Sequence, residues 1–230
     1  MRRRVEHVMG MPVAIAGDGD LDAAFAWLRW VDATFSTYRE DSEIRRIDRG
    51  ELARRDAHPL VRLVLGRCER LRRETRGYFD ARADGTLDPS GLVKGWAAER
   101  AFRLAGPDAC VDAGGDVRVG PGRRWRVGIR HPHDAGALAA TLELTDGAVA
   151  TSGAYARGDH VLDPHTGRPP SGVASVTVVG PDLATADAYA TAAFAMGEAG
   201  PRWTAGLRGY EAMTIAGDRV LTTAGFPAAT

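Results

Sequence analysis

The stretch ACVDAGGDVRVGPGRRWRVGI, residues 109–129, decides the fold class. It contains three short β-prone runs, at residues 109–112, 117–119 and 125–129, and glycine-rich turn residues separate them. Short runs punctuated by glycine and proline are typical of strands that follow one another in an antiparallel sheet. The stretch therefore predicts a mainly antiparallel sheet in this half of the chain.

The same pattern continues towards the C-terminus. We expect further strands at residues 138–144, 148–151, 160–162 and 173–179, a helix at about 185–196, a shorter helix near 201–207 and two final strands. No internal repeat or low-complexity linker interrupts this order. Residues 1–230 are therefore predicted to form a single domain.

Helical periodicity dominates the residues before 109. We expect a strand at residues 5–16, then helices at 21–36, around Ile44 and Ile47, at 59–76 and at 91–105. Two sets of apolar residues recur at helical spacing and are predicted to face the core: Leu21, Phe25, Leu28, Val31 and Phe35 in the first helix, and Leu60, Leu63, Val64, Cys68 and Leu71 in the third. Helices followed by strands and a further helix indicate an α+β fold in which helices pack on a mainly antiparallel sheet. Strict βαβα alternation is absent, which disfavours a doubly wound dinucleotide fold.

Composition excludes several classes of protein. The 230 residues are 44% hydrophobic, which excludes a disordered chain, and 30 basic residues balance 30 acidic ones, which argues against a general nucleic-acid binder. No run approaches the roughly 18 to 20 apolar residues of a membrane span, and no export signal is evident, so we expect a cytoplasmic protein. Cys68 and Cys110 are expected to be reduced thiols. Lys94 is the only lysine among the 30 basic residues.

Familiar phosphate, dinucleotide, zinc-protease, Cys-x-x-Cys and nucleophile-elbow motifs are absent. His131 and His133 flank a proline and could form a metal pair, but no third ligand is near in sequence, so a solvated loop is favoured. The segment Asp88–Gly95 leads into a helix with a lysine that could face an anion, although, taken alone, an ordinary capped helix with one surface lysine is the favoured interpretation. The Gly114-Gly115-Asp116 turn allows either a hairpin or a close approach to a ligand.

Two later segments offer acid–base and metal-binding groups. His160 lies three residues before Asp163 in a Pro/Gly-shaped loop, and an imidazole there is a natural acid–base group, although a lone histidine is more often structural. Asp187 and Thr191 stand at i and i+4 of a predicted helix and share a face. A carboxylate and a hydroxyl are hard oxygen ligands of the kind that Mg²⁺ takes, and a plain helix with a capping aspartate is the alternative.

Together these segments resemble the ApbE family of FAD:protein FMN transferases. The matching segments occur in family order from residue 9 to about 197: Met9–Val13, Ser36–Ile44, Gly77–Asp80, Asp88–Gly95, Gly114–Asp116, Trp125–Ile129, Thr151–Gly153, His160–Pro169 and Asp187–Thr191. Each segment is short, and the ordered set carries the specificity.

The resemblance implies a reaction and a set of site residues. Family members bind FAD and, with Mg²⁺, transfer its FMN half to a Ser or Thr of an acceptor protein, releasing AMP. Residues matching the FAD contacts are Met9, Tyr38, Tyr78, Phe79, Asp80, Asp88, Lys94 and Leu162. The Gly91 carbonyl, Asp187 and Thr191 would hold Mg²⁺, and His160 would help to deprotonate the attacking hydroxyl.

The chain departs from the family in two ways. Typical members carry several dozen residues between the segments that hold Asp80 and Asp88, whereas only residues 81–87 separate them here. The usual export or lipoprotein signal is also missing. Both departures bear on acceptor recognition and cellular setting. Two other functions share these motifs: an Mg²⁺-dependent FAD pyrophosphatase that yields FMN and AMP, and a non-catalytic FAD-binding protein.

Overall fold

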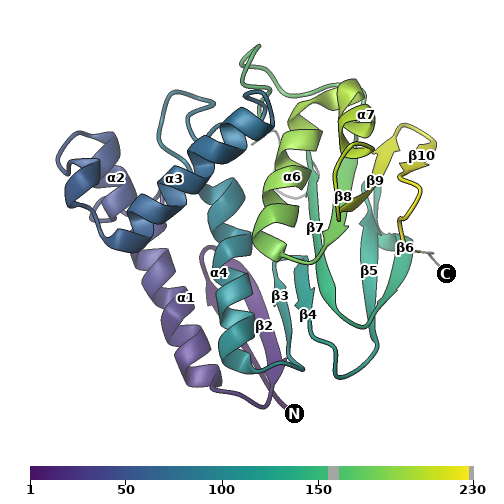
Figure 1. The fold of residues 1–230 in the computed structure, drawn as a ribbon, viewed down its shortest axis with the longest axis horizontal. Coiled ribbons are helices and arrows are strands. Elements are labelled where there is room, and N and C mark those ends of the chain that lie inside the picture. The colour runs from purple at the N-terminus through teal and green to yellow at the C-terminus, as the bar shows by residue number, and fades with distance from the viewer. Residues whose placement is uncertain (155–160, 228–230) are drawn as a thin grey trace.

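A large antiparallel sheet forms the frame of the molecule (Figure 1). The computed structural model describes residues 1–154 and 161–227. Within them, eight strands pair in the order β1-β2-β3-β4-β7-β8-β9-β10, and every neighbouring pair is antiparallel. Their bounds are β1 Arg2–Val8, β2 Met11–Gly17, β3 Cys110–Ala113, β4 Asp116–Val119, β7 Gly147–Gly153, β8 Ser175–Gly180, β9 Glu211–Ala216 and β10 Arg219–Thr222. The predicted α+β class with a mainly antiparallel sheet is confirmed.

Helices cover one face of this sheet, and a two-stranded hairpin covers the other. The hairpin comprises β5 Trp125–His131 and β6 Asp134–Leu144. The helices are α1 Leu21–Phe35, α2 Glu43–Asp48, α3 Pro59–Glu74, α4 Ser90–Ala105, α6 Leu183–Ala195 and α7 Gly200–Thr204, with 3₁₀ turns at Arg54–Asp56 and Gly197–Ala199. Helix α4 packs between α1 and α6, and α6 lies against β7 and β8. The sheet is therefore the middle layer of three.

Alternation along the strands sends side chains into two separate cores. Val111 and Ala150 pack with the helices, whereas Val117 and Val149 pack with residues of the β5–β6 hairpin such as Leu142. Because successive side chains of a strand point to opposite faces, residues of β7 serve both cores. The candidate site described below lies on the helix side.

Three predicted features were wrong. The strand expected at residues 5–16 is two strands, β1 and β2, because the chain reverses at Met9 and Gly10, whose φ angles are 57° and 72°. A two-residue hairpin turn needs positive φ at both positions, and Met-Gly lacks the Asn or Asp that usually signals it. A strand was also expected at residues 160–162, but Leu162 lies outside any strand. Leu63 is 51% exposed, and Val61 occupies the buried position of α3 instead.

Both cysteines are free, as expected. Burial raises the pKa of the Cys68 thiol to about 12 and that of Cys110 to about 11. A thiol that stays protonated is a poor nucleophile, so both behave as small apolar residues. No helix within the described ranges is both long enough and apolar enough to cross a membrane.

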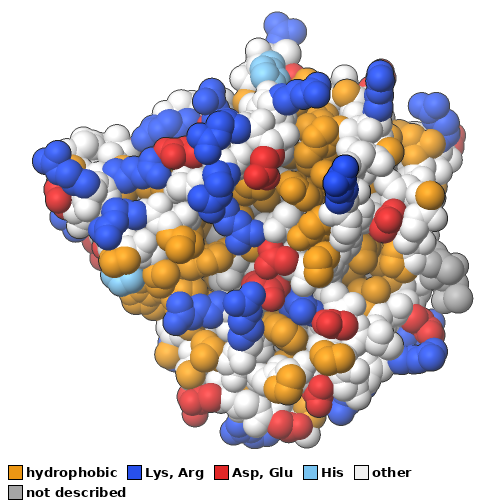
Figure 2. All heavy atoms as spheres, in the orientation of Figure 1, with side chains coloured by type: hydrophobic (Ala, Val, Ile, Leu, Met, Phe, Trp, Pro, Cys, Tyr) orange, Lys and Arg blue, Asp and Glu red, His pale blue; other side chains and the backbone are white. Residues whose placement is uncertain are grey.

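The surface charge is uneven although the formal net charge is zero. Figure 2 shows cationic side chains gathered over the region that α3 occupies in Figure 1. The exposed arginines of this helix are Arg62, Arg70, Arg72 and Arg73. The balance of charges in the composition is therefore not reproduced locally.

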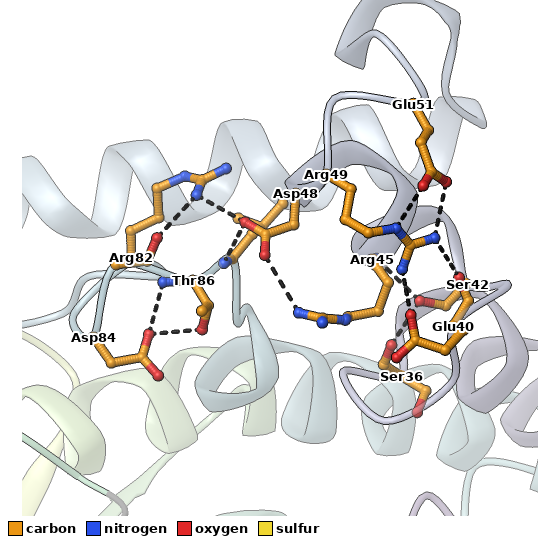
Figure 3. A network of polar contacts seen from close by, with 12 residues as sticks. Ser36, Glu40, Ser42, Arg45, Asp48, Arg49, Glu51, Arg82, Asp84 and Thr86 are labelled. Carbon is orange, nitrogen blue, oxygen red and sulfur yellow. Dashed lines mark hydrogen bonds and ion pairs between the residues drawn. The ribbon is translucent and has the colours of Figure 1, made fainter.

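The Asp48 carboxylate of α2 holds the short connection at residues 81–87 through hydrogen bonds. Asp48 Oδ1 accepts hydrogen bonds of 2.9 Å from the Arg82 guanidinium and from the Leu87 amide. The other oxygen, Oδ2, accepts a 3.3 Å hydrogen bond from Arg45 (Figure 3). These bonds give a connection without regular secondary structure a defined path to the start of α4.

Candidate functional site

The lone lysine lies between two buried carboxylates. Lys94 projects from the second turn of α4, and its Nζ atom is 2.7 Å from Asp116 Oδ2 and 3.4 Å from Asp187 Oδ1. Asp116 comes from β4 and Asp187 from α6, and each is only 2% exposed. Three elements that are distant in sequence thus place one cation and two anions together. Buried charges need such pairing because an isolated one is costly.

Close contact between α4 and α6 positions Asp187. The Gly95 amide donates a 2.9 Å hydrogen bond to Asp187 Oδ2. A Cβ atom on Gly95 would lie 2.5 Å from the Leu183 carbonyl oxygen and 2.9 Å from Asp187 Cβ, so only glycine permits this approach. Burial raises the pKa of Asp187 to about 7, the Lys94 ammonium opposes that rise, and Asp116 adds to it.

Hard oxygen atoms surround the same contact. Thr191 lies one turn after Asp187 on α6, and its Oγ1 atom is 3.4 Å from Ser152 Oγ on β7. A Cβ atom on Gly91 would lie 3.4 Å from Thr191 Oγ1 and 3.3 Å from the Phe79 ring. Gly91 of α4 therefore faces Thr191 across a cradle that a larger side chain would fill.

This donor set fits Mg²⁺. A carboxylate, a hydroxyl and a nearby backbone carbonyl are hard oxygen ligands, and Mg²⁺ usually takes one or two carboxylates together with water and phosphate oxygens. Among the described residues, no three His, Cys, Asp or Glu side chains are grouped so as to hold a metal. The rings of His131, the last residue of β5, and His133 lie 5.9 Å apart.

Asp116 is a site residue that the sequence analysis did not single out. It opens a strand whose four residues are all buried, and its Oδ1 atom accepts a 3.2 Å hydrogen bond from the Thr151 amide on β7. From the sequence, Asp116 is predicted only as part of the Gly114–Asp116 turn. A carboxylate directly before the alternating Val-Arg-Val run was the available signal, because a buried aspartate requires a partner.

A second buried ion pair supports the two helices that form the site. Arg118 Nε lies 3.3 Å from Glu99 Oε2, and both residues are less than a tenth exposed. The same Glu99 oxygen accepts a 3.0 Å hydrogen bond from the Leu183 amide, at the first residue of α6. Glu99 therefore joins α4 to both β4 and α6.

The predicted flavin-contacting turn lies partly at this site. Phe79 is 3% exposed and adjoins Gly91. Tyr78 packs edge-on against the His165 ring, with 4.6 Å between the ring centroids, and His165 Nε2 lies 3.1 Å from the Arg76 carbonyl oxygen. Asp80 pairs with Arg72 at 2.8 Å. The turn is thus held against the loop at residues 163–168.

The other predicted contacts are more dispersed. Met9 lies in the β1–β2 turn and packs against the helix-side core, whereas the Tyr38 side chain is 94% exposed. Asp88 accepts a 2.8 Å hydrogen bond from the Ser90 amide at the start of α4, and Leu162 is half-buried. Within residues 1–154 and 161–227, Asp187 and Thr191 make no hydrogen bond or ion pair with any of these four. His160 lies outside the described residues.

Comparison with known proteins shows the family. The family model described as the ApbE family matches residues 9–85 and 81–214, and the two matches meet at the short connection between Asp80 and Asp88. Two relatives, each named FAD:protein FMN transferase, come from Treponema pallidum (37% identity over 143 residues, 51% of this chain and 40% of the relative) and Rhodobacter capsulatus (39% over 127 residues, 49% and 24%). The chain thus spans less than half the length of these relatives.

Solved structures agree with the fold. The ApbE protein of Thermotoga maritima superposes with a TM-score of 0.84 at 22% identity, over 98% of this chain and 97% of that one. The flavin transferase ApbE from Vibrio cholerae gives a TM-score of 0.81 at 24% identity, over 98% and 97%. The family match covers most of the chain, and the shared fold is consistent with it. This chain therefore belongs to the ApbE family.

Proposed function

We propose that this protein is an Mg²⁺-dependent FAD:protein FMN transferase, which moves FMN from FAD to a Ser or Thr hydroxyl of an acceptor protein and releases AMP. One observation carries the proposal: in a chain of the ApbE family, the only lysine is half-buried and pairs with the buried Asp187, one helical turn before Thr191, whose hydroxyl adjoins that of Ser152. Two relatives that share about half of this chain carry the name of that activity.

The reaction replaces a phosphoanhydride bond of FAD with a phosphoester bond to the acceptor. A bond forms between the acceptor hydroxyl oxygen and the FMN phosphorus, and the pyrophosphate bond to AMP breaks. Negative charge develops on the departing AMP oxygen, and a fixed cation stabilises it most where water is excluded. Lys94 supplies such a cation, and its side chain is 22% exposed, so an anionic ligand can reach it.

The metal site follows from the same geometry. We infer that Asp187, Thr191 and the Gly91 carbonyl hold Mg²⁺, which when bound neutralises phosphate charge. The proton of the acceptor hydroxyl needs a base, and His160 is our candidate. For flavin and adenine contacts we propose the residues identified from the resemblance: Met9, Tyr38, Tyr78, Phe79, Asp80, Asp88 and Leu162. We also propose that residues 1–230 act as one domain, in the cytoplasm.

Incubation of the purified protein with FAD, Mg²⁺ and an acceptor carrying an Asp-x-x-Ser/Thr-Gly-Ala-Thr segment tests the proposal. Covalent fluorescent flavin on the acceptor is the expected result. FMN and AMP released at the same rate without acceptor would instead identify a pyrophosphatase, and FAD bound without turnover would identify a binding protein.

The Asp187→Ala variant tests the metal assignment. It should abolish metal-dependent turnover, because the only carboxylate of the proposed metal site is lost. Asp218→Ala, in the turn between β9 and β10, is the matched control and should leave turnover unchanged. Full turnover by Asp187→Ala would remove this carboxylate from the metal site.

A further inference from the structure

The three charged groups at the centre of the site do not balance. Lys94 contributes one positive charge, and Asp116 and Asp187 contribute two negative charges when both are ionised. Both carboxylates are almost completely buried. An unbalanced buried anion is costly, so this arrangement favours binding of a further cation. Lys94 and that cation would compete for Asp187.

The two contacts of the ammonium are unequal. Both contacts are ion pairs, and the ammonium nitrogen lies 2.7 Å from Asp116 Oδ2 but 3.4 Å from Asp187 Oδ1. Asp116 is itself held by the Thr151 amide, and Asp187 by the Gly95 amide. The backbone thus fixes both carboxylates, and the ammonium lies nearer to Asp116.

We propose that Asp116 is a positioning residue that holds the Lys94 ammonium, so that Asp187 can bind a divalent cation while Lys94 stays in the site. An anionic ligand then meets an ammonium and a metal side by side. This inference rests on the proposed function, since it assumes the metal site formed by Asp187, Thr191 and Gly91. Without Asp116, the ammonium still lies within ion-pair distance of the buried Asp187 and competes with the metal there.

The single lysine allows a direct test by NMR. Protein labelled with ¹³Cε,¹⁵Nζ-lysine gives one side-chain signal, from Lys94, provided that no tag adds another lysine. We would titrate wild type and Asp116→Asn with Mg²⁺ in the absence of FAD and follow this signal. Asp112→Asn is the matched control, because Asp112 is exposed on the neighbouring strand and accepts only the Gly115 amide hydrogen bond through Oδ1.

The proposal predicts different results for the wild type and for Asp116→Asn. In wild type and Asp112→Asn, Mg²⁺ should saturate the site while the Lys94 signal keeps the shift of a paired ammonium. In Asp116→Asn, Mg²⁺ should bind about tenfold to a hundredfold more weakly, an effect of the size seen when a residue outside the ligand set of a metal site is lost, because the Lys94 ammonium then competes for Asp187. At saturation its Lys94 signal should move away from the position that it keeps in the wild type. Thermal melting of each variant confirms that it is folded.

Two results would overturn the proposal. One is a wild-type Lys94 signal that moves to the free-lysine position when Mg²⁺ binds, and the other is an Asp116→Asn titration that matches the wild type. If Mg²⁺ binds to none of the proteins, both the metal site and this inference are wrong. The flavin-transfer assay on the same samples separates these outcomes from failure of the proposed activity.

Discussion

Replacing Gly95 with alanine should loosen the contact between α4 and α6 on which the site depends. The added Cβ would meet the Leu183 carbonyl oxygen at 2.5 Å, and a backbone atom cannot rotate away as a side chain can. Overpacking of this kind costs about 1–3 kcal/mol. Alanine recovers up to about 1 kcal/mol through its higher helix propensity. We therefore expect a net loss of about 1–2 kcal/mol in the free energy of unfolding.

The assay is thermal and urea-induced unfolding, with Gly66→Ala as the matched control. For a chain of this length, that loss lowers Tm by about 2–8 °C. Gly66 also lies inside a helix, α3, but a Cβ there would meet nothing closer than an Arg54 nitrogen at 3.8 Å. Gly66→Ala should therefore raise the stability, by about 0.4–1 kcal/mol. If Gly95→Ala is as stable as Gly66→Ala, the close approach of the two helices is not real and the reasoning fails.

Three other substitutions test the electrostatics of the site. Burial raises the pKa of Asp187 to about 7 in the folded protein, so between about pH 4 and 7 the folded state binds a proton that the unfolded state has lost. The contribution of Asp187 to the free energy of unfolding should therefore fall as the pH rises through this range. Asp187→Asn should flatten that decline in urea unfolding measured without metal. Glu99→Gln weakens the buried contact with Arg118, which keeps its ion pair with Asp146, and should cost about 1–3 kcal/mol, whereas Glu143→Gln, in an exposed pair, should change Tm by less than a degree or two. Lys94→Arg should keep the fold but lower kcat/KM for FAD about tenfold or more, because a planar guanidinium does not fit where a compact ammonium lies; a fully active variant would show that the lone lysine has no special role.

Local patterns predicted most of the elements. The five apolar residues chosen for the first helix are all buried in α1, because a 3.6-residue period depends only on the chain's own spacing. The short runs predicted after residue 109 likewise correspond to antiparallel strands, except for the run that ends at Leu162. The reversal at Met9 and Gly10 was missed because its positive φ angles are imposed by the pairing of β1 with β2, and neighbouring residues do not signal them.

Part of the candidate site was also predicted, from the spacing of two residues on a helix and from the rarity of lysine. Asp187 and Thr191 share a helix face, which spacing alone reveals, and Lys94 drew attention through its rarity. Asp116 was passed over because its role exists only after β4 lies beside α4, and its distance in sequence from Lys94 and Asp187 hides that contact. Periodicity predicts which face of an element is buried, but it does not predict which charged groups of separate elements meet.

The zero net charge of this chain likewise does not predict the charge at the candidate site. Composition counts charges over the whole molecule, whereas the cost of a charge depends on its depth and its nearest partner. At the surface, the arginines of α3 are solvated and cost little. In the interior, among the residues that the structure describes, one half-buried ammonium between two buried carboxylates leaves a local excess of negative charge. The close packing of Gly95 against α6 creates this imbalance, so helix packing, and not the overall composition, determines which cations and phosphates the site can bind.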